Sequence, residues 1–530
     1  MRKQALLRTA LALTGVLVLI GCSGGGKPSS ASSSGSSDSP SVAIVQGGDA
    51  TVLLPAAPLD LDPSTSQDNN ASMPMWKAWF QNLVQATENG LEPQLASEWK
   101  TSKDELTYTF MLDSAATFSD GEPVTAADVV FSLRHNLSPD VSLLHFLESK
   151  IASMEAVDTS TVSIVLKTPW PHLLADLSSP TAAIYSQAAF EDTDPKSFFN
   201  TAPVGTGPFT LGEVVANTSY TVRRNDSYWQ PETAAHLDSI EFQIVTDETA
   251  RVSAVLGGRA DIAQSPPGNQ IAGLQSNSSV DVATFPSSRV DLIVLNTTKP
   301  PFDDVKLRQA FSLALDREAM VKAGLFGYGD VATTLIVPPP ALTFQNTKLD
   351  LYPRDVDKAK QLVAESGVST PIPVELTVST GSAQEAILTI AQQNLGDVGF
   401  TVKSVRKDPA SVDNDIIGQT YTAATTFWGD VMADPSIQPQ FALDPGYCCD
   451  AYFSGYDDPQ LVALVQKAIN ATDTTEAQSL FDELQRKAAE AAFLVPLYYP
   501  QLTYLLSKDI GGFSADPFGF YDWAAVGRTS

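Results

Sequence analysis

Apolar and polar residues alternate in several short stretches of the chain, and this period of two is typical of half-buried β-strands. The clearest cases are residues 106–112 and 162–166. Other stretches carry apolar residues at helical spacing, most clearly 459–471 and 474–492. Because strand and helix patterns alternate along the chain, the sequence favours α/β units.

Further elements are predicted from the same patterns and from the turn residues at their ends. The predicted strands are 240–245, 290–296, 374–378, 401–405, 493–499 and 502–506. The predicted helices are 76–85, 352–367 and 383–397. We find no internal repeat among these elements.

Residues 117–134, TFSDGEPVTAADVVFSLR, combine a strand end, a tight turn and a capped helix. The strand is predicted to end at Phe118, and the Ser-Asp-Gly that follows has turn chemistry. Thr125 fits an N-cap, and Asp128 three residues later gives the spacing of a capping box. The apolar residues after the cap fall on one helical face, namely Val129, Val130, Leu133 and Leu137.

The first residues have the pattern of an export signal. Positive charges are followed by the apolar run 11–20, which is too short for a comfortable transmembrane helix. The run ends in Leu-Ile-Gly-Cys, which resembles a bacterial lipobox and predicts removal of residues 1–21 and lipidation of Cys22. The alternative is an ordinary signal peptide with an incidental cysteine. The stretch 22–41 is rich in Ser and Gly after the cysteine, and this composition predicts a flexible tether.

The 530-residue chain carries a formal net charge of -28. We therefore expect no nucleic-acid binding and no electrostatic docking on anionic lipid, and an acidic surface that favours solubility is the simplest interpretation. Three cysteines are too few for a disulfide framework or a cysteine-rich metal site. The adjacent Cys448 and Cys449 are either free buried thiols or a strained vicinal disulfide.

Several motifs occur in a distinctive order. After 117–134 come PVGTGPF at 203–209 and PPFDDVKLRQAFSLALDRE at 300–318. Shorter segments are LDP at 61–63, LEPQLASEW at 91–99 and RNDSYW at 224–229. Together they resemble the extracytoplasmic solute-binding proteins of ABC importers, family 5, which includes the dipeptide- and oligopeptide-binding proteins. A phosphate-binding loop is the alternative for 203–209, but no Lys-Ser/Thr follows the glycines and Pro208 blocks a helix start.

The resemblance implies an α/β, two-lobed periplasmic-binding-protein-like fold of type II, in its large cluster C form. Lobe I would comprise residues 42–292, with an extra subdomain at about 78–202. Lobe II would comprise 293–497, and 498–530 would return to lobe I. A ligand would bind in the cleft between the lobes, and hinge closure would bury it.

Catalysis finds little support. The chain has no G-x-S-x-G, H-E-x-x-H or C-x-x-C pattern. Its four histidines, His135, His145, His172 and His236, are scattered and have no partner motif. We therefore predict a protein that is not an enzyme and that has no metal site and no cofactor. A surface-anchored hydrolase, with a triad assembled only in space, is the alternative of a different class.

The candidate ligand site lies where a β-type run ends in Phe427-Trp428-Gly429-Asp430. Peptide-binding relatives carry an aromatic-rich W-x-x-D-x-x-D-P stretch at this place. The resemblance implies that Asp430 binds the free ammonium of a peptide, with Trp428 as the neighbouring wall and Phe427 and Gly429 beside it. Such a charge-assisted contact is worth about 1.5–3 kcal/mol. The alternative for Asp430 is a turn residue that caps the loop.

The ligand class is narrowed by a missing arginine. Dipeptide-specific members carry an arginine shortly after the strand that corresponds to 374–378, where it binds the peptide carboxylate. The residues here are Ser379-Thr380-Gly381-Ser382, so bidentate carboxylate capture at this place is not supported. This difference points away from strict dipeptides and toward oligopeptides or a ligand without that group.

We therefore predict a lipid-anchored, extracytoplasmic and monomeric binding protein, located at the cell surface or in the periplasm. It would deliver peptides to an ABC permease whose energy comes from a separate ATPase. Within the same fold, the alternative cargo is a nickel chelate, an oligosaccharide or haem. A receptor or adhesin that has lost transport is a further alternative.

Overall fold

The computed structural model describes most of the chain after residue 42. The described residues are 43–58, 60–65, 72–87, 90–138, 142, 144–335, 344, 350–429, 434–447, 450–516 and 518–530. The predicted lipidation site Cys22, the predicted ammonium ligand Asp430 and the pair Cys448 and Cys449 lie outside them.

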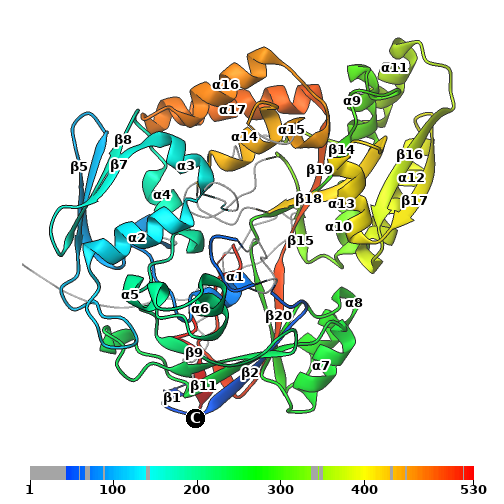
Figure 1. Ribbon diagram of the computed structural model, residues 1–530. Helices are drawn as coiled ribbons and strands as arrows, with labels where there is room; N and C mark the ends of the chain where they lie inside the picture. Colours follow the sequence, from blue (N-terminus) through cyan, green and yellow to red (C-terminus); the bar gives the residue numbers. More distant parts are fainter. Residues whose placement is uncertain are drawn as a thin grey trace, which may run out of the picture. The chain divides into compact units, whose positions relative to one another are not determined.

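Within these residues, the largest sheet has seven strands in the order β13-β20-β12-β2-β11-β10-β9. Central β2 (Asp49–Leu54) is parallel to both β11 (Ser239–Ile244) and β12 (Ile262–Gln264). The flanking strands pair antiparallel and are β9 (Phe209–Val215), β10 (Ser219–Arg224), β13 (Val280–Phe285) and β20 (Leu502–Ser507). Two helices pack beside one half of this sheet, α7 (Glu248–Leu256) and α8 (Gly268–Gln275) (Figure 1).

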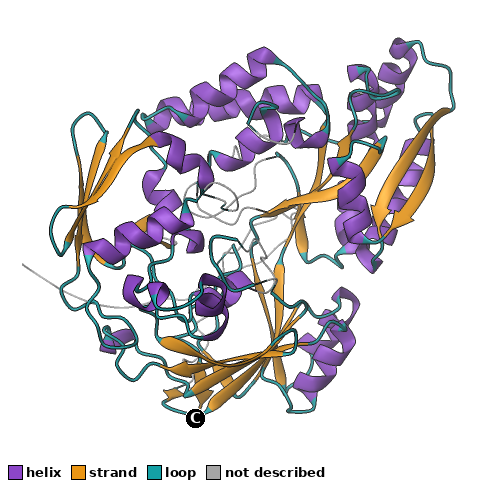
Figure 2. Cartoon of the chain, viewed as in Figure 1, coloured by secondary structure: helices purple, strands orange, loops and turns teal. Residues whose placement is uncertain are grey.

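A second sheet, with six described strands, has the order β15-β19-β14-β18-β16-β17. Its strands are β14 (Arg289–Leu295), β15 (Gly329–Val331), β16 (Ile372–Ser379), β17 (Phe400–Lys407), β18 (Ala423–Gly429) and β19 (Leu494–Pro500). β16 is parallel to β17 and β18, and the other pairs are antiparallel. The mixed pairing matches the predicted α/β units, and helices lie against the strands of both sheets (Figure 2).

The chain passes between the two sheets at two places. β13 of the first sheet is followed by β14 of the second, and β19 of the second is followed by β20 of the first. Only residues 286–288 separate the first pair of strands, and only Gln501 separates the second pair. Because β14 and β19 are also hydrogen-bonded neighbours, the two passages lie close together.

Smaller sheets complete the described strands. A four-stranded sheet is built from β5 (Ala96–Thr101), β6 (Thr107–Leu112), β8 (Thr161–Leu166) and β7 (Ile151–Ala156). A hairpin joins β3 (Val84–Thr87) and β4 (Gly90–Pro93). The chain's described ends meet in β1 (Ile44–Val45), β22 (Gly527–Thr529) and β21 (Ile510–Gly511).

The remaining helices fall into two groups along the chain. Those before the first passage are α1 (Ser72–Trp76), α2 (Ala126–Asn136), α3 (His145–Lys150), α4 (Leu173–Leu177), α5 (Gln187–Glu191) and α6 (Pro195–Thr201). Those between the passages are α9 (Val305–Ala314), α10 (Arg317–Gly324), α11 (Val356–Ser366), α12 (Ser382–Gly396), α13 (Pro409–Ile417), α14 (Ile437–Leu443), α16 (Pro459–Ile469) and α17 (Thr474–Ala491). Segment α15 (Asp450–Phe453) contains left-handed residues and is a turn rather than a regular helix.

The predicted capping of α2 is confirmed. The Thr125 hydroxyl accepts from the Asp128 backbone N–H, and the Asp128 carboxylate accepts from the Thr125 N–H. Val129 and Leu133 on the predicted apolar face are fully buried. Local capping chemistry therefore places the start of this helix as the sequence indicated.

The PVGTGPF motif brings two backbone segments together. A Cβ atom at Gly205 would lie 2.0 Å from the carbonyl oxygen of Trp79, and one at Gly207 would lie 2.5 Å from that of Ala78. The Gly207 and Phe209 N–H groups donate to the carbonyl oxygens of Trp79 and Ala78. The glycines are needed because no side chain fits this close approach.

The predicted helix 76–85 is wrong. α1 ends at Trp76, and β3 begins at Val84. Gln81 and Asn82 instead point their amides at other segments: Gln81 Nε2 donates to the Tyr228 hydroxyl, and Asn82 Nδ2 donates to the Leu177 and Ser179 carbonyl oxygens. These contacts and the strand pairing of β3 override a helix-like apolar spacing.

One hydrophobic cluster spans elements that are far apart in sequence. It runs from β6, β8, α2 and α4 to α14, α16 and α17, and includes Leu173, Leu177, Leu443 and Ile469. The region of the four-stranded sheet therefore packs directly on the helices that follow β18. Among the described helices, none is both long and apolar enough to cross a membrane.

Candidate functional site

The predicted site residues Phe427, Trp428 and Gly429 end strand β18. In the antiparallel pairing with β14, Arg289 is opposite Gly429 and Asp291 is opposite Phe427. Successive strand residues face opposite sides of a sheet, so Phe427 and Trp428 are expected to have different neighbours.

The Phe427 ring lies against an arginine. It is 49% exposed, and the guanidinium carbon of Arg289 is 3.9 Å from its ring centre. Arg289 also donates from Nε to Asp291 Oδ2 at 2.7 Å and from Nη2 to Asp291 Oδ1 at 2.8 Å. Asp291 is buried, so this bidentate pair and the aromatic ring hold the guanidinium in one orientation.

Trp428 packs in the opposite direction. Its ring centre is 4.6 Å from that of Phe441 and 6.1 Å from that of Tyr452. The Tyr452 hydroxyl donates to the backbone carbonyl oxygen of Phe427. The structure thus separates Trp428 from Phe427 and makes the tryptophan part of an aromatic cluster.

Phe427 and Gly429 line a cavity of about 270 Å³ where the chain passes between the two large sheets; we call it the crossing cavity. Residues on both sides of the two passages contribute to it, among them Gln264 and Tyr504 from the first sheet and Asp291 and Tyr498 from the second. Its polar lining includes Gln264, Ser287, Ser288, Arg289, Gln384 and Gln501. A polar cavity at the meeting of two sheets suits a ligand-binding role.

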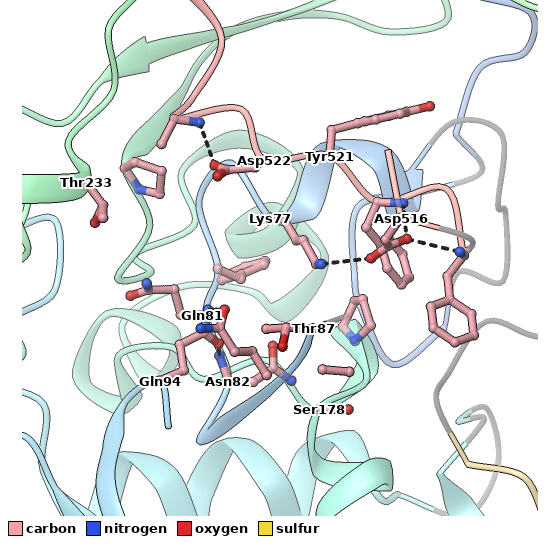
Figure 3. A pocket seen from close by; sticks show the side chains of 18 of the residues that line it. Lys77, Gln81, Asn82, Thr87, Gln94, Ser178, Thr233, Asp516, Tyr521 and Asp522 are labelled. Carbon is pink, nitrogen blue, oxygen red and sulfur yellow. Dashed lines mark hydrogen bonds and ion pairs between the residues drawn. The ribbon is translucent and has the colours of Figure 1, made fainter. Parts of the chain in front are cut away.

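A second cavity, of about 620 Å³, lies beside α1 and the C-terminal segment (Figure 3). In Figure 3 the Lys77 ammonium donates to the Asp516 carboxylate, at 3.2 Å. Several of its carboxamides bind one another or nearby hydroxyls: Gln94 donates to Gln85, and Tyr228 donates to Gln230. These internal bonds give the side chains a structural role: Gln85 ties β3 to the segment after β4, and Lys77 ties the segment after α1 to the C-terminal segment.

A buried acidic cluster connects α4 with the loop before α14. Asp176 is 0% exposed, and its Oδ2 accepts from Trp170 Nε1 at 2.8 Å. Burial raises the pKa of Asp176 well above its usual range, and the nearby Asp434 carboxylate raises it further. Burial also lowers the pKa of the Lys150 ammonium, which lies 3.6 Å from the centre of the Trp170 ring.

Asp434 is also buried and hydrogen-bonded. Asp434 is 2% exposed and accepts from the Ser436 N–H at 2.7 Å. His172 Nδ1 is 3.8 Å from Asp434 Oδ1, and His172 Nε2 donates to the Ile469 carbonyl oxygen at 2.9 Å. The cluster thus joins α4 to the end of α16 as well as to the loop.

Sequence reasoning missed Arg289, Asp291, Gln264 and the Asp176–Asp434 pair as site candidates. Asp291 lies in the predicted buried strand 290–296, and Arg289 directly precedes that strand. The available signal was a pair of opposite charges two residues apart, which fall on one face of a strand. The Asp176–Asp434 pair has no sequence signal because its members belong to distant segments. No group of three or more potential metal ligands occurs among the described residues.

Comparison with known proteins gives the family. The model of bacterial extracellular solute-binding proteins, family 5 (middle), matches residues 90–446. The glutathione-binding protein GsiB of Shigella dysenteriae is 30% identical over 479 residues, which cover 87% of this chain and 91% of GsiB.

Solved structures share the fold. The ABC transporter substrate-binding protein CtaP of Listeria monocytogenes aligns with a TM-score of 0.80 and 25% identity, over 92% of this chain and 100% of CtaP. DppA of Helicobacter pylori, in complex with the peptide STSA, aligns with a TM-score of 0.78 and 22% identity, over 92% of this chain and 99% of DppA. The predicted two-lobed α/β fold is therefore confirmed, and the chain belongs to the family 5 bacterial extracellular solute-binding proteins.

Proposed function

We propose that this protein captures short peptides for an ABC importer. The observation that carries the proposal is the 30% identity to a glutathione-binding protein across 87% of the chain. Glutathione is itself a small peptide with free carboxylates and an ammonium group. The polar crossing cavity supports the same class of ligand because it offers charged and carboxamide groups in a confined space.

The ligand would bind between two lobes, with residues 42–292 and 498–530 in lobe I and 293–497 in lobe II. The subdomain at about 78–202 would belong to lobe I. The two passages between the large sheets support this division because they are short and adjacent. Short adjacent connections suit a hinge, since few backbone angles need to change on closure.

Asp430 would bind the peptide ammonium, and Phe427, Trp428 and Gly429 would position the segment that carries it. The support from the described residues is that Trp428 anchors the end of β18 in an aromatic cluster. Asp430 directly follows this strand end in the sequence, and the strand end is held in place by the packing of Trp428.

Closure around the peptide would be the signal that the permease recognises. A separate ATPase would supply the energy, and the protein would act as a monomer held outside the cell membrane by lipid on Cys22. The lipobox-like segment and the Ser- and Gly-rich tether support the anchor. Such a tether lets a membrane-held protein reach its transporter.

The test is a thermal-shift screen on protein that has been unfolded, washed free of ligand and refolded. The panel contains glutathione, di-, tri- and longer peptides, nickel chelates, oligosaccharides and haem. A ligand at a hundred times its dissociation constant stabilises the folded state by about 2.7 kcal/mol, which gives a clear shift. Stabilisation by peptides supports the proposal, and stabilisation by another class alone would transfer the same role to that cargo.

A further inference from the structure

Arg289 is held firmly but retains unused hydrogen-bonding capacity. A guanidinium has five N–H donors, and the two bonds to Asp291 use only the Nε edge. Its other N–H groups make no hydrogen bond within the described part of the chain. The side chain is 38% exposed, so these donors remain accessible to a ligand.

The cavity has one cation and one anion in its described lining, Arg289 and Asp291. Both carboxylate oxygens of Asp291 already accept from Arg289, and Asp291 is only 4% exposed. Asp291 is thus a positioning residue that is turned toward its arginine. The Phe427 ring covers a face of the guanidinium, which leaves the edges for in-plane bonds to a ligand.

A second group of the cavity wall, the Gln264 carboxamide, has an acceptor that is unused among the described residues. Gln264 lines the cavity and is 5% exposed, and its Oε1 accepts no hydrogen bond from the described residues. Its backbone is fixed, because Arg251 Nε donates to the Gln264 carbonyl oxygen at 2.9 Å. A buried carboxamide without a partner is unfavourable, so a ligand N–H that reached this oxygen would gain a bond and remove that penalty.

The size of the cavity indicates which part of a ligand it holds. Its volume of about 270 Å³ lies below the roughly 300–1,000 Å³ of pockets that enclose a whole small molecule. It therefore suits one end of a longer ligand. A peptide's last residue carries both a carboxylate and an N–H group, which match the donors of Arg289 and the acceptor of Gln264.

We propose that the crossing cavity is the subsite for the carboxylate end of the ligand, with Arg289 binding the carboxylate and Gln264 accepting the neighbouring N–H. The subsite rests on the proposed peptide-binding function. It also accounts for the segment at the end of β16, Ser379 to Ser382, which provides no arginine. The carboxylate is then bound from β14 rather than from the loop after β16.

The experiment compares matched peptides by isothermal titration calorimetry on ligand-stripped protein. The pairs are tri-alanine with tri-alanine amide, and glutathione with its glycine amide. Wild-type protein is expected to bind each free acid at least tenfold more tightly than its amide. Arg289→Gln should weaken the free acids at least tenfold and leave the amides within twofold, so that the preference disappears.

The control is Arg224→Gln, which removes an arginine paired with Asp226 and Asp238 but outside the cavity lining. It should keep the wild-type preference. Equal binding of acid and amide by wild-type protein would overturn the subsite while leaving the peptide function intact. An equal loss for both peptides in Arg289→Gln would also overturn it. Absence of binding by every peptide would instead reject the peptide function and this subsite together. The wild-type comparison can still refute the subsite if the variant does not fold.

Discussion

Replacement of Asp176 by asparagine should make the protein more stable at neutral pH. Burial and the Asp434 carboxylate raise the pKa of Asp176 well above its usual range. Its Oδ1 has no hydrogen-bond partner among the described residues, while Oδ2 accepts from Trp170 Nε1. The asparagine side chain of the variant would keep an acceptor for Trp170 and would carry no charge at any pH.

The direction of the pH effect on stability follows from whether Asp176 holds its proton in the folded and in the unfolded state. Below the unfolded pKa of about 3.9, Asp176 is protonated in both the folded and the unfolded protein. Above it, the unfolded chain loses this proton while the folded protein keeps it. The stability that the raised pKa provides is therefore fully present in acid and is lost as the pH rises through the folded pKa.

The size of this pH effect on the free energy of unfolding corresponds to the binding of one proton. Between the unfolded and the folded pKa, the free energy of unfolding falls by about 1.4 kcal/mol per pH unit on account of this group. In Asp176→Asn that contribution is absent. The free energy of unfolding of the variant minus that of wild type should therefore rise by about 1.4 kcal/mol per pH unit above about pH 4.5, and then level off.

The assay is urea unfolding of both proteins at several pH values, followed by tryptophan fluorescence and circular dichroism. Subtracting the wild-type curve cancels the titration of the groups that do not interact with Asp176. A difference between the two proteins that does not change with pH would refute the reasoning. Asp158→Asn is the control. Hydrogen bonds from the Ser160 backbone and from Thr161 lower the pKa of this exposed carboxyl. The difference in unfolding free energy between variant and wild type should therefore fall with rising pH below about pH 3.9 and stay constant above it.

Three further changes test other parts of the molecule. Asp430→Ala should weaken the binding of peptides with a free N-terminus at least tenfold (about 1.4 kcal/mol) and leave the binding of N-acetylated peptides unchanged in calorimetry. Identical affinities for variant and wild type would reject this ammonium site. Cys22→Ser should move the protein from the membrane to the soluble fraction, and retention in the membrane would argue against the lipid anchor. Gly207→Ala should destabilise the folded protein by about 1–3 kcal/mol in thermal unfolding, because the added Cβ would lie 2.5 Å from backbone atoms. Its control is Gly273→Ala in helix α8, where the added Cβ would meet nothing within 4 Å, and which should stabilise the protein slightly.

The sequence by itself determined the parts of this protein that depend on neighbouring residues. Thr125 and Asp128 cap α2, as the local pattern indicated. Asp304 caps α9 and Gly367 ends α11 in a left-handed conformation through contacts that are equally local. Caps, turns and alternating strands involve groups only a few residues apart, so their chemistry is visible along the chain. The family motifs likewise indicated the fold.

Only the tertiary structure decided which distant groups meet. The segment after Trp76 has helix-like spacing, but pairing of β3 and the contacts of Gln81 and Asn82 determine its conformation. Asp176 differs from the many exposed carboxylates because packing buries it and brings Asp434 close to it. Arg289 becomes a candidate ligand-binding residue through its place in the crossing cavity. Burial and electrostatic environment depend on long-range packing, which residue spacing alone does not specify.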